Sequence, residues 1–157
     1  MDVDLITRIA AALRREGVRY KVVGAIALNA HGIARGTQDL DLFVEPSDAN
    51  IARLRDALKS VFASDPSLDE ISASDLAGDY PAIQYVSPDG AFSIDILARL
   101  GEPFGFDDLE ATETTWRGVP MTVVSPKQLY LMKRDMVRPQ DQADALKLRA
   151  RFGIEEP

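Results

Sequence analysis

Three aspartates set in apolar stretches are the candidate catalytic residues of this chain. Asp39 and Asp41 alternate with Leu40 and Leu42, and alternation along a strand sends both carboxylates to the same face. Two side chains placed in this way start roughly 7 Å apart, a separation that one or two divalent cations can close. The pattern predicts a site for metal-dependent phosphoryl or nucleotidyl transfer.

Asp95 supplies a third carboxylate, within Ile94-Asp95-Ile96. Because strand interiors disfavour aspartate, its presence there indicates a function. Three carboxylates from two strands favour Mg²⁺ or Mn²⁺ over softer metals, and we expect them to converge at the bottom of a cleft. The alternative is structural: an exposed edge strand and an exposed hairpin face would also carry these aspartates.

A glycine turn precedes the first two aspartates. Gly24 follows the short apolar stretch Val22-Val23 and leads into residues 25–31, which are rich in helix formers. A turn that enters a helix in this way points backbone N–H groups at phosphate oxygens. We therefore expect Gly24 to border the same cleft as the three carboxylates.

The elements that must position these residues follow from periodicity and turn signals. Apolar spacing and a stop at Gly17 predict a helix over 3–16, and a strand over 18–23 follows. Ser47 is the expected N-cap of a helix after the Asp39 strand. The composition of 64–80 indicates a loop with at most one helical turn. Two β-hairpins are expected, one from 82–86 and 91–97 and one from 112–116 and 119–124.

Helices are expected to close the chain. Ser125, Pro126 and Gln128 read as an N-cap, a first helical residue and the far end of a capping box. Pro139 interrupts the helical pattern, and Gly153 ends the last helix. This order predicts an α+β fold, with a mixed sheet flanked by helices. We expect a single domain over 1–157, in which 1–124 form the α/β core and 125–153 the C-terminal helical segment.

Composition excludes several classes of function. The chain has 157 residues and no cysteine, so disulfides, thiolate nucleophiles and cysteine-ligated zinc are ruled out. The sequence shows no signal peptide and no membrane-spanning stretch, and we expect a cytoplasmic protein with no membrane partner. The net charge of −7 disfavours broad nonspecific binding to nucleic acid. Only residues 127–151, with 7 basic and 3 acidic residues, form a basic segment.

The stretch GAIALNAHGIARGTQDLDLFV, together with Asp95, resembles the DNA polymerase beta-like nucleotidyltransferase superfamily. More narrowly, it is similar to small bacterial nucleotidyltransferases related to AbiE-type toxins and to minimal nucleotidyltransferases. The resemblance implies that Asp39 and Asp41 ligate the ion that carries the triphosphate of a nucleoside triphosphate (NTP). It implies that Asp95 completes a second metal site and helps to deprotonate an acceptor hydroxyl.

The same resemblance implies which residues bind the nucleotide. They are the turn residues Gly24 and Ala25, the loop residues Arg35 and Thr37, and Lys133 in a C-terminal helix. Ala25 stands where similar proteins have serine or glycine. Residues 138–141 resemble the Arg-x-Lys-Asp motif of these toxins, with Gln140 at the position of the lysine. For Arg35, the interpretation as a surface residue weighs equally with the interpretation as a phosphate ligand.

Three functions stay open on the sequence. The first is transfer of a nucleoside monophosphate to RNA or protein by the toxin of a toxin–antitoxin pair, with an antitoxin protein as a possible partner. The second is modification of a small molecule such as an antibiotic. The third is a non-catalytic nucleotide- or partner-binding module that retains the fold, an interpretation that Ala25 and Gln140 sustain.

Overall fold

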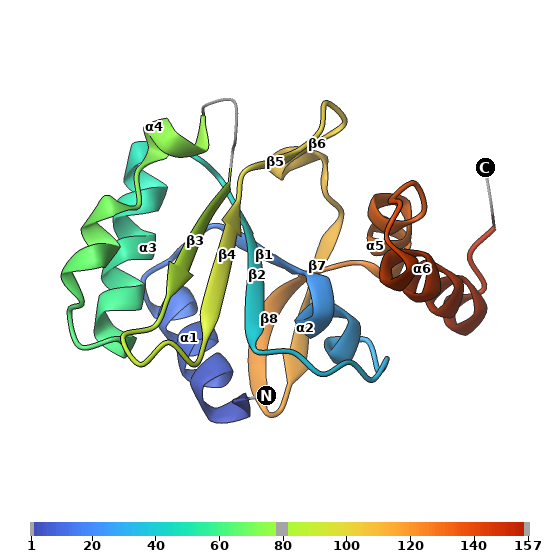
Figure 1. Ribbon diagram of the computed structural model, residues 1–157, viewed down its shortest axis with the longest axis horizontal. Helices are drawn as coiled ribbons and strands as arrows, with labels where there is room; N and C mark the ends of the chain where they lie inside the picture. Colours follow the sequence, from blue (N-terminus) through green and yellow to red (C-terminus); the bar gives the residue numbers. More distant parts are fainter. Residues whose placement is uncertain (1, 78–81, 156–157) are drawn as a thin grey trace.

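The computed structural model describes residues 2–77 and 82–155, and its centre is a mixed six-stranded sheet (Figure 1). The strands lie in the order β3-β4-β2-β1-β8-β7. Their bounds are Tyr20–Val23 (β1), Asp39–Val44 (β2), Ala82–Val86 (β3), Ser93–Leu97 (β4), Ala111–Trp116 (β7) and Val119–Val124 (β8). A separate two-stranded sheet joins β5 (Arg99–Leu100) to β6 (Phe104–Gly105). The mixed sheet and flanking helices confirm the predicted α+β class.

Parallel pairing brings strands that are distant in the sequence together at the centre of the sheet. β2 pairs in parallel with β4, and β1 pairs in parallel with β8. The remaining pairs, β1–β2, β3–β4 and β7–β8, are antiparallel. The two predicted hairpins are β3–β4 and β7–β8, and both are confirmed. β2 is therefore flanked by β1 on one side and β4 on the other.

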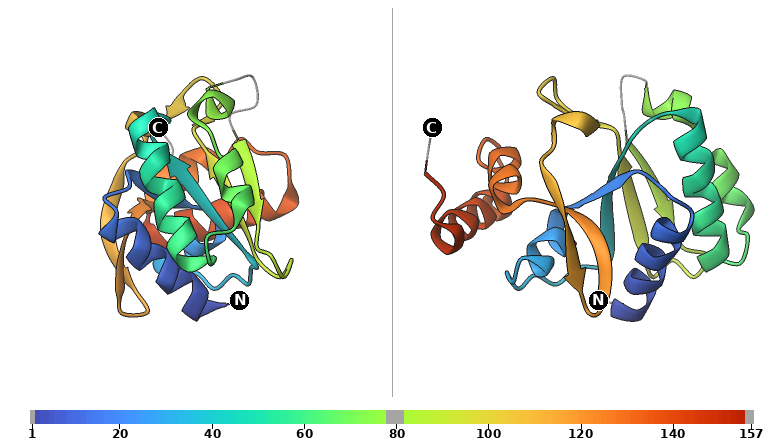
Figure 2. Two further views of the ribbon diagram at one scale, coloured as in Figure 1. Left: turned by 90° about the vertical axis from the view of Figure 1, so that its left-hand side faces the viewer. Right: turned by 180° about the vertical axis from the view of Figure 1, so that it is seen from behind.

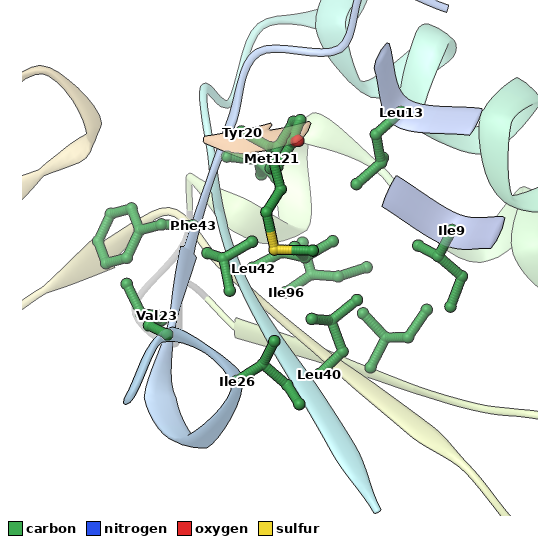
Figure 3. Close-up of a cluster of buried hydrophobic side chains, with 14 of the residues drawn as sticks. Ile9, Leu13, Tyr20, Val23, Ile26, Leu40, Leu42, Phe43, Ile96 and Met121 are labelled. Carbon is green, nitrogen blue, oxygen red and sulfur yellow. The ribbon is translucent and has the colours of Figure 1, made fainter. Parts of the chain in front are cut away.

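One face of the sheet packs against α1 (Val3–Arg15) and α3 (Asp48–Val61). Asp2 caps α1, and Ser47 caps α3 as the sequence predicts. Leu40, Leu42 and Ile96 point toward Ile9 and Leu13 of α1, whereas Phe43 lies on the other side of the strands (Figure 3). Burial of these apolar side chains fixes which face the alternating aspartates must occupy.

The helices α5 (Pro126–Lys133) and α6 (Pro139–Phe152) lie on the other side of the molecule from α1 and α3 (Figures 1 and 2). Ser125 caps α5 and Pro126 begins it, as expected. Gly153 ends α6 in a left-handed conformation. In the sequence, the segments that connect the strands also contain four short helices. They are α2 (Gly24–Ala30), α4 (Ala73–Leu76) and two 3₁₀ helices, η1 (Pro66–Glu70) and η2 (Phe106–Asp108).

Three local predictions were wrong or only partly right. Residues 64–77 form two short helices, η1 and α4, because Asp65 and Ser72 each cap a turn; residues 78–80 of the predicted loop lie outside the described residues. The first strand begins at Tyr20, not at residue 18. Gln128 does not complete a capping box, since its side-chain oxygen accepts a hydrogen bond from the backbone N–H of Glu110. That bond joins α5 to the start of β7.

No helix within residues 2–77 and 82–155 is long and apolar enough to cross a membrane. The predicted division between a core ending at residue 124 and a helical segment within one domain stays a prediction.

Candidate active site

The parallel pairing of β2 with β4 places Asp41 directly opposite Asp95 and Asp39 opposite Ser93. Register partners in paired strands project to the same face of the sheet. All three aspartates therefore lie on the face opposite Leu40 and Leu42, as the alternation predicts. The structure thus brings together carboxylates that are more than fifty residues apart in the sequence.

The pKa of Asp41 lies above that of an ordinary aspartate. Burial raises the pKa of Asp41 to about 7, and a hydrogen bond with Asp95 and repulsion from Asp95 and Asp39 act in the same direction. The positive charge of Lys133 lowers it in part. Two carboxylates in contact cannot both ionise without repulsion, so this pair is suited to hold either a proton or a cation.

Asp39 is the more exposed of the two β2 aspartates, and its carboxylate accepts a hydrogen bond from the hydroxyl of Ser93. Within residues 2–77 and 82–155 no group of three acidic, histidine or cysteine side chains is arranged to hold a metal ion. The expected convergence of three carboxylates is therefore met by Asp41 and Asp95 only. Oxygen ligands of this kind fit Mg²⁺ or Mn²⁺, with Asp39 within electrostatic reach of Asp41.

Gly24 is forced to be glycine by the same carboxylate. Its φ of 69° is left-handed, and a Cβ at this position would lie 2.0 Å from Oδ2 of Asp41. The backbone of the turn thus packs directly against the metal-binding candidate. Ala25 follows as a buried residue near the start of α2.

A cavity of about 180 Å³ opens between this face and the C-terminal helices. Its polar lining comes from Gly24, Asp41, Lys133, Arg138 and Asp141. Its apolar lining consists of Val23, Leu97, Leu100, Leu129, Met132 and Met136. Gly24 borders the cavity together with Asp41, as expected, but Asp39 and Asp95 are not among its lining residues. The cavity combines a charged end with an apolar wall.

Lys133 reaches the cavity from the last turn of α5. Its ammonium nitrogen donates hydrogen bonds to Asp141 and Asp144, each over 3.1 Å. An ammonium group has three N–H donors, so these two bonds leave one for the cavity.

Arg35 and Thr37, the other predicted nucleotide ligands, do not line the cavity. The Arg35 guanidinium pairs with the buried carboxylate of Asp144. The Thr37 hydroxyl accepts a hydrogen bond from the backbone N–H of Asp39 over 3.0 Å and so fixes the start of β2. Both residues hold the loop before β2 in place.

The sequence alone did not point to Asp144 or Ser93 as residues of the site. It also did not show that Asp141 contacts Lys133. The spacing Asp141-x-x-Asp144 was a usable signal, because residues three apart share a helix face. On this face of α6, Asp141 and Asp144 contact Lys133 and form a cluster of opposite charges with it. The cluster also includes Arg138, whose Nε lies 2.8 Å from Asp141.

Solved structures of other proteins share this fold. A protein from Thermotoga maritima described as a nucleotidyltransferase aligns over 96% of this chain and 92% of its own, with a TM-score of 0.58 and 13% identity. ANT(2″)-Ia, solved with adenylyl-2″-tobramycin, aligns over 97% and 90%, with a TM-score of 0.59 and 17% identity. A nucleotidyltransferase-like protein from Paracoccidioides brasiliensis aligns over 94% and 74%, with a TM-score of 0.60 and 16% identity. The fold is that of the nucleotidyltransferases.

Residues 11–151 match the family described as nucleotidyl transferase AbiEii toxin, type IV toxin–antitoxin system. The chain belongs to this family, and the resemblance inferred from the sequence is confirmed. No curated protein sequence matches the chain.

Proposed function

We propose that this chain transfers a nucleoside monophosphate from an NTP to a hydroxyl of a cytoplasmic acceptor, RNA or protein, and releases pyrophosphate. In this role it is the toxin of a toxin–antitoxin pair, and an antitoxin protein is its natural partner. The observation that carries the proposal is the Asp41–Asp95 pair, set against the Gly24 turn and beside Lys133. Membership of the AbiEii family supports the same chemistry.

Asp39, Asp41 and Asp95 are the proposed ligands of Mg²⁺ or Mn²⁺. Two such ions, when bound, neutralise the triphosphate and lower the pKa of an attacking hydroxyl. Asp95 is in addition the proposed acceptor of the proton that the hydroxyl loses. A cation is well matched to these oxygens, because burial, which raises the pKa of Asp41 most, and the neighbouring carboxylates both disfavour its ionised form unless a positive charge offsets them.

The phosphates are proposed to lie between the glycine turn and α5. Gly24 and Lys133 both line the cavity, and the Lys133 ammonium has a third N–H donor beyond its bonds to Asp141 and Asp144. Ala25, the next residue of the turn, belongs to the same proposed set. Arg35 and Thr37 do not line the cavity, so their proposed contribution to nucleotide binding is to hold the loop before β2 in place. The apolar wall of the cavity suits the base or another flat, apolar group of the substrate.

A small-molecule hydroxyl is the second candidate acceptor. The observation in its favour is the net charge of −7, since an RNA acceptor needs a basic track and only residues 127–151 offer one. ANT(2″)-Ia, whose fold is similar, was solved in complex with adenylyl-2″-tobramycin, which is an adenylylated small molecule. A non-catalytic module is the third candidate, because Ala25 lacks the hydroxyl that serine would place at the turn.

The test is incubation of the purified protein with Mg²⁺, cell extract and NTPs labelled at the α-phosphate. We expect a labelled acceptor with the wild-type protein, and a loss of about 10²-fold or more in Asp39→Ala and Asp95→Ala. Asp56→Asn, at an exposed aspartate of α3, is the matched control and should label normally. Nucleotide binding without labelling by the wild type would overturn the enzymatic proposal. In a parallel incubation with NTPs labelled at the γ-phosphate, a label transferred from that phosphate alone would identify a different reaction.

A further inference from the structure

Asp144 of α6 is a fully buried carboxylate, with a side-chain exposure of 0%. Its partners come from three segments: Arg35 in the loop before β2, Lys133 of α5, and Gln140 at the start of α6, whose Nε2 lies 3.2 Å away. A buried charge is costly unless it is paired, so this arrangement must be held by the whole cluster.

The cluster keeps Asp144 ionised. Burial alone would raise the pKa of Asp144, but hydrogen bonds from Arg35 and Lys133 and the charge of Lys133 outweigh it and lower the pKa below its ordinary value. Asp144 is therefore a permanent negative charge at neutral pH, and it attracts both cations continuously.

The position of Lys133 depends on that charge. Its ammonium is held by Asp144 and Asp141 and is only 14% exposed. It also lines the cavity that contains Asp41, and its charge lowers the pKa of Asp41. A lysine has a long, flexible stem, so without Asp144 an ammonium held by Asp141 alone would be freer to move toward the Asp41–Asp95 pair. There it would compete directly with a divalent cation.

We propose that Asp144 is a positioning residue of the active site, which anchors Lys133 and Arg35 and holds the Lys133 ammonium off the Asp41–Asp95 pair. The pair is thereby left open for a divalent cation, while Lys133 keeps one donor directed to the substrate. This inference rests on the proposed function, because it takes Asp41 and Asp95 to be metal ligands.

The test is a titration of the purified protein with Mn²⁺ alone, followed by electron paramagnetic resonance of the unbound ion. In Asp144→Asn we expect the affinity for Mn²⁺ to fall about tenfold, the usual effect of removing a residue that orients a metal site. Gln140→Ala is the matched control, since it removes a neutral partner of Asp144 and leaves both cations in place. Its affinity should equal that of the wild type.

The double variant Asp144→Asn/Lys133→Gln separates positioning from a merely structural role. The competing ammonium is gone, so the affinity for Mn²⁺ should return to the wild-type value. If the double variant binds as weakly as Asp144→Asn, or if Asp144→Asn binds as tightly as the wild type, the proposal is wrong.

Two further measurements keep the outcomes distinct. Lys133→Gln alone should leave Mn²⁺ affinity near the wild-type value, and a rise of about tenfold or more would overturn the proposal because Lys133 would already be competing. This variant tests the idea even if Asp144→Asn does not fold. Failure of the proposed function looks different: wild type and Asp41→Asn would bind Mn²⁺ equally poorly, before any comparison at Asp144.

Discussion

Two pairs of aspartates lie on either side of the same cavity, and their environments have opposite effects. Asp41 and Asp95 face each other across β2 and β4, and Asp41 has its pKa raised to about 7. Asp141 and Asp144 lie one turn apart on α6, and both have lowered pKa values. Burial raises the pKa in each of these three cases, so burial does not explain the difference.

The difference lies in the partners. The α6 pair receives hydrogen bonds from Arg35, Lys133 and Arg138, whereas Asp41 has another carboxylate as its hydrogen-bond partner. One pair is neutralised by the protein itself and serves to fix Lys133 and the loop before β2. The Asp41–Asp95 pair has no basic side chain in contact with it among residues 2–77 and 82–155, which is the condition that a cation site requires.

The largest expected effect, on the free energy of unfolding, comes from removing a positively charged partner of the Asp141–Asp144 pair. Arg35→Met leaves Asp144 buried with one fewer positive partner, and breaking a buried ion pair in this way should lower the free energy of unfolding by about 3 kcal/mol. Chemical denaturation followed by circular dichroism measures the change.

Arg14→Ala is the matched control for Arg35→Met. It breaks the ion pair with Glu113, whose side chains are 56% and 61% exposed, and exposed pairs contribute about 1 kcal/mol or less. Equal losses in the two variants would show that the Asp144 cluster is no more important to the fold than a surface pair.

The sequence predicted the Asp41–Asp95 pair as a candidate site. It did not predict the partners of the Asp141–Asp144 pair. Alternation along β2 is a local property, so the shared face of Asp39 and Asp41 follows from the sequence alone. That Asp95 joins them on this face depends on the pairing of β2 with β4. The partners of Asp144 do not follow from the sequence either, because Arg35 lies 109 residues away and meets it only when α6 docks. Helical periodicity places Asp144 on a face of α6 but cannot show what that face contacts.

The same limit applies to detail within the predicted site. The pattern placed Asp39 beside the other two carboxylates, but side-chain torsions decide that it accepts a bond from Ser93. Likewise, Gly24 was expected at a phosphate-binding turn, whereas its contact with Asp41 depends on how β1 and β2 pair. Residue types and faces are fixed locally, and partners are fixed by packing.

An intermediate effect is expected from neutralising Asp41 in protein kept free of divalent ions. The folded-state pKa lies above the ordinary 3.8, so the stabilising contribution of the protonated group is complete below about pH 4 and is lost as the pH rises through 7. Asp41→Asn should therefore raise the free energy of unfolding at both pH values, by about 2 kcal/mol more at pH 8 than at pH 5. Thermal unfolding in EDTA at both pH values measures this.

Asp141→Asn provides the contrast for that experiment. The pKa of Asp141 is lowered, so its ionised, paired form is the stabilising one and persists at both pH 5 and pH 8. The variant should be destabilised to the same extent at both. If Asp41→Asn behaves in the same way, the two aspartate pairs do not differ as their surroundings indicate.

The smallest effect, on metal binding, is expected at Ser93. Its hydroxyl donates a hydrogen bond to the carboxylate of Asp39, which lies on the same sheet face as the Asp41–Asp95 pair. Removing one such bond in Ser93→Ala should weaken Mn²⁺ binding by about 1 kcal/mol, or about fivefold, because Asp39 loses the contact that holds its carboxylate in place. Ser93→Thr keeps a hydroxyl and should bind as the wild type does. A gain in affinity in Ser93→Ala would reverse the assignment: Ser93 would then withhold Asp39 from the metal, and the site would consist of Asp41 and Asp95 alone.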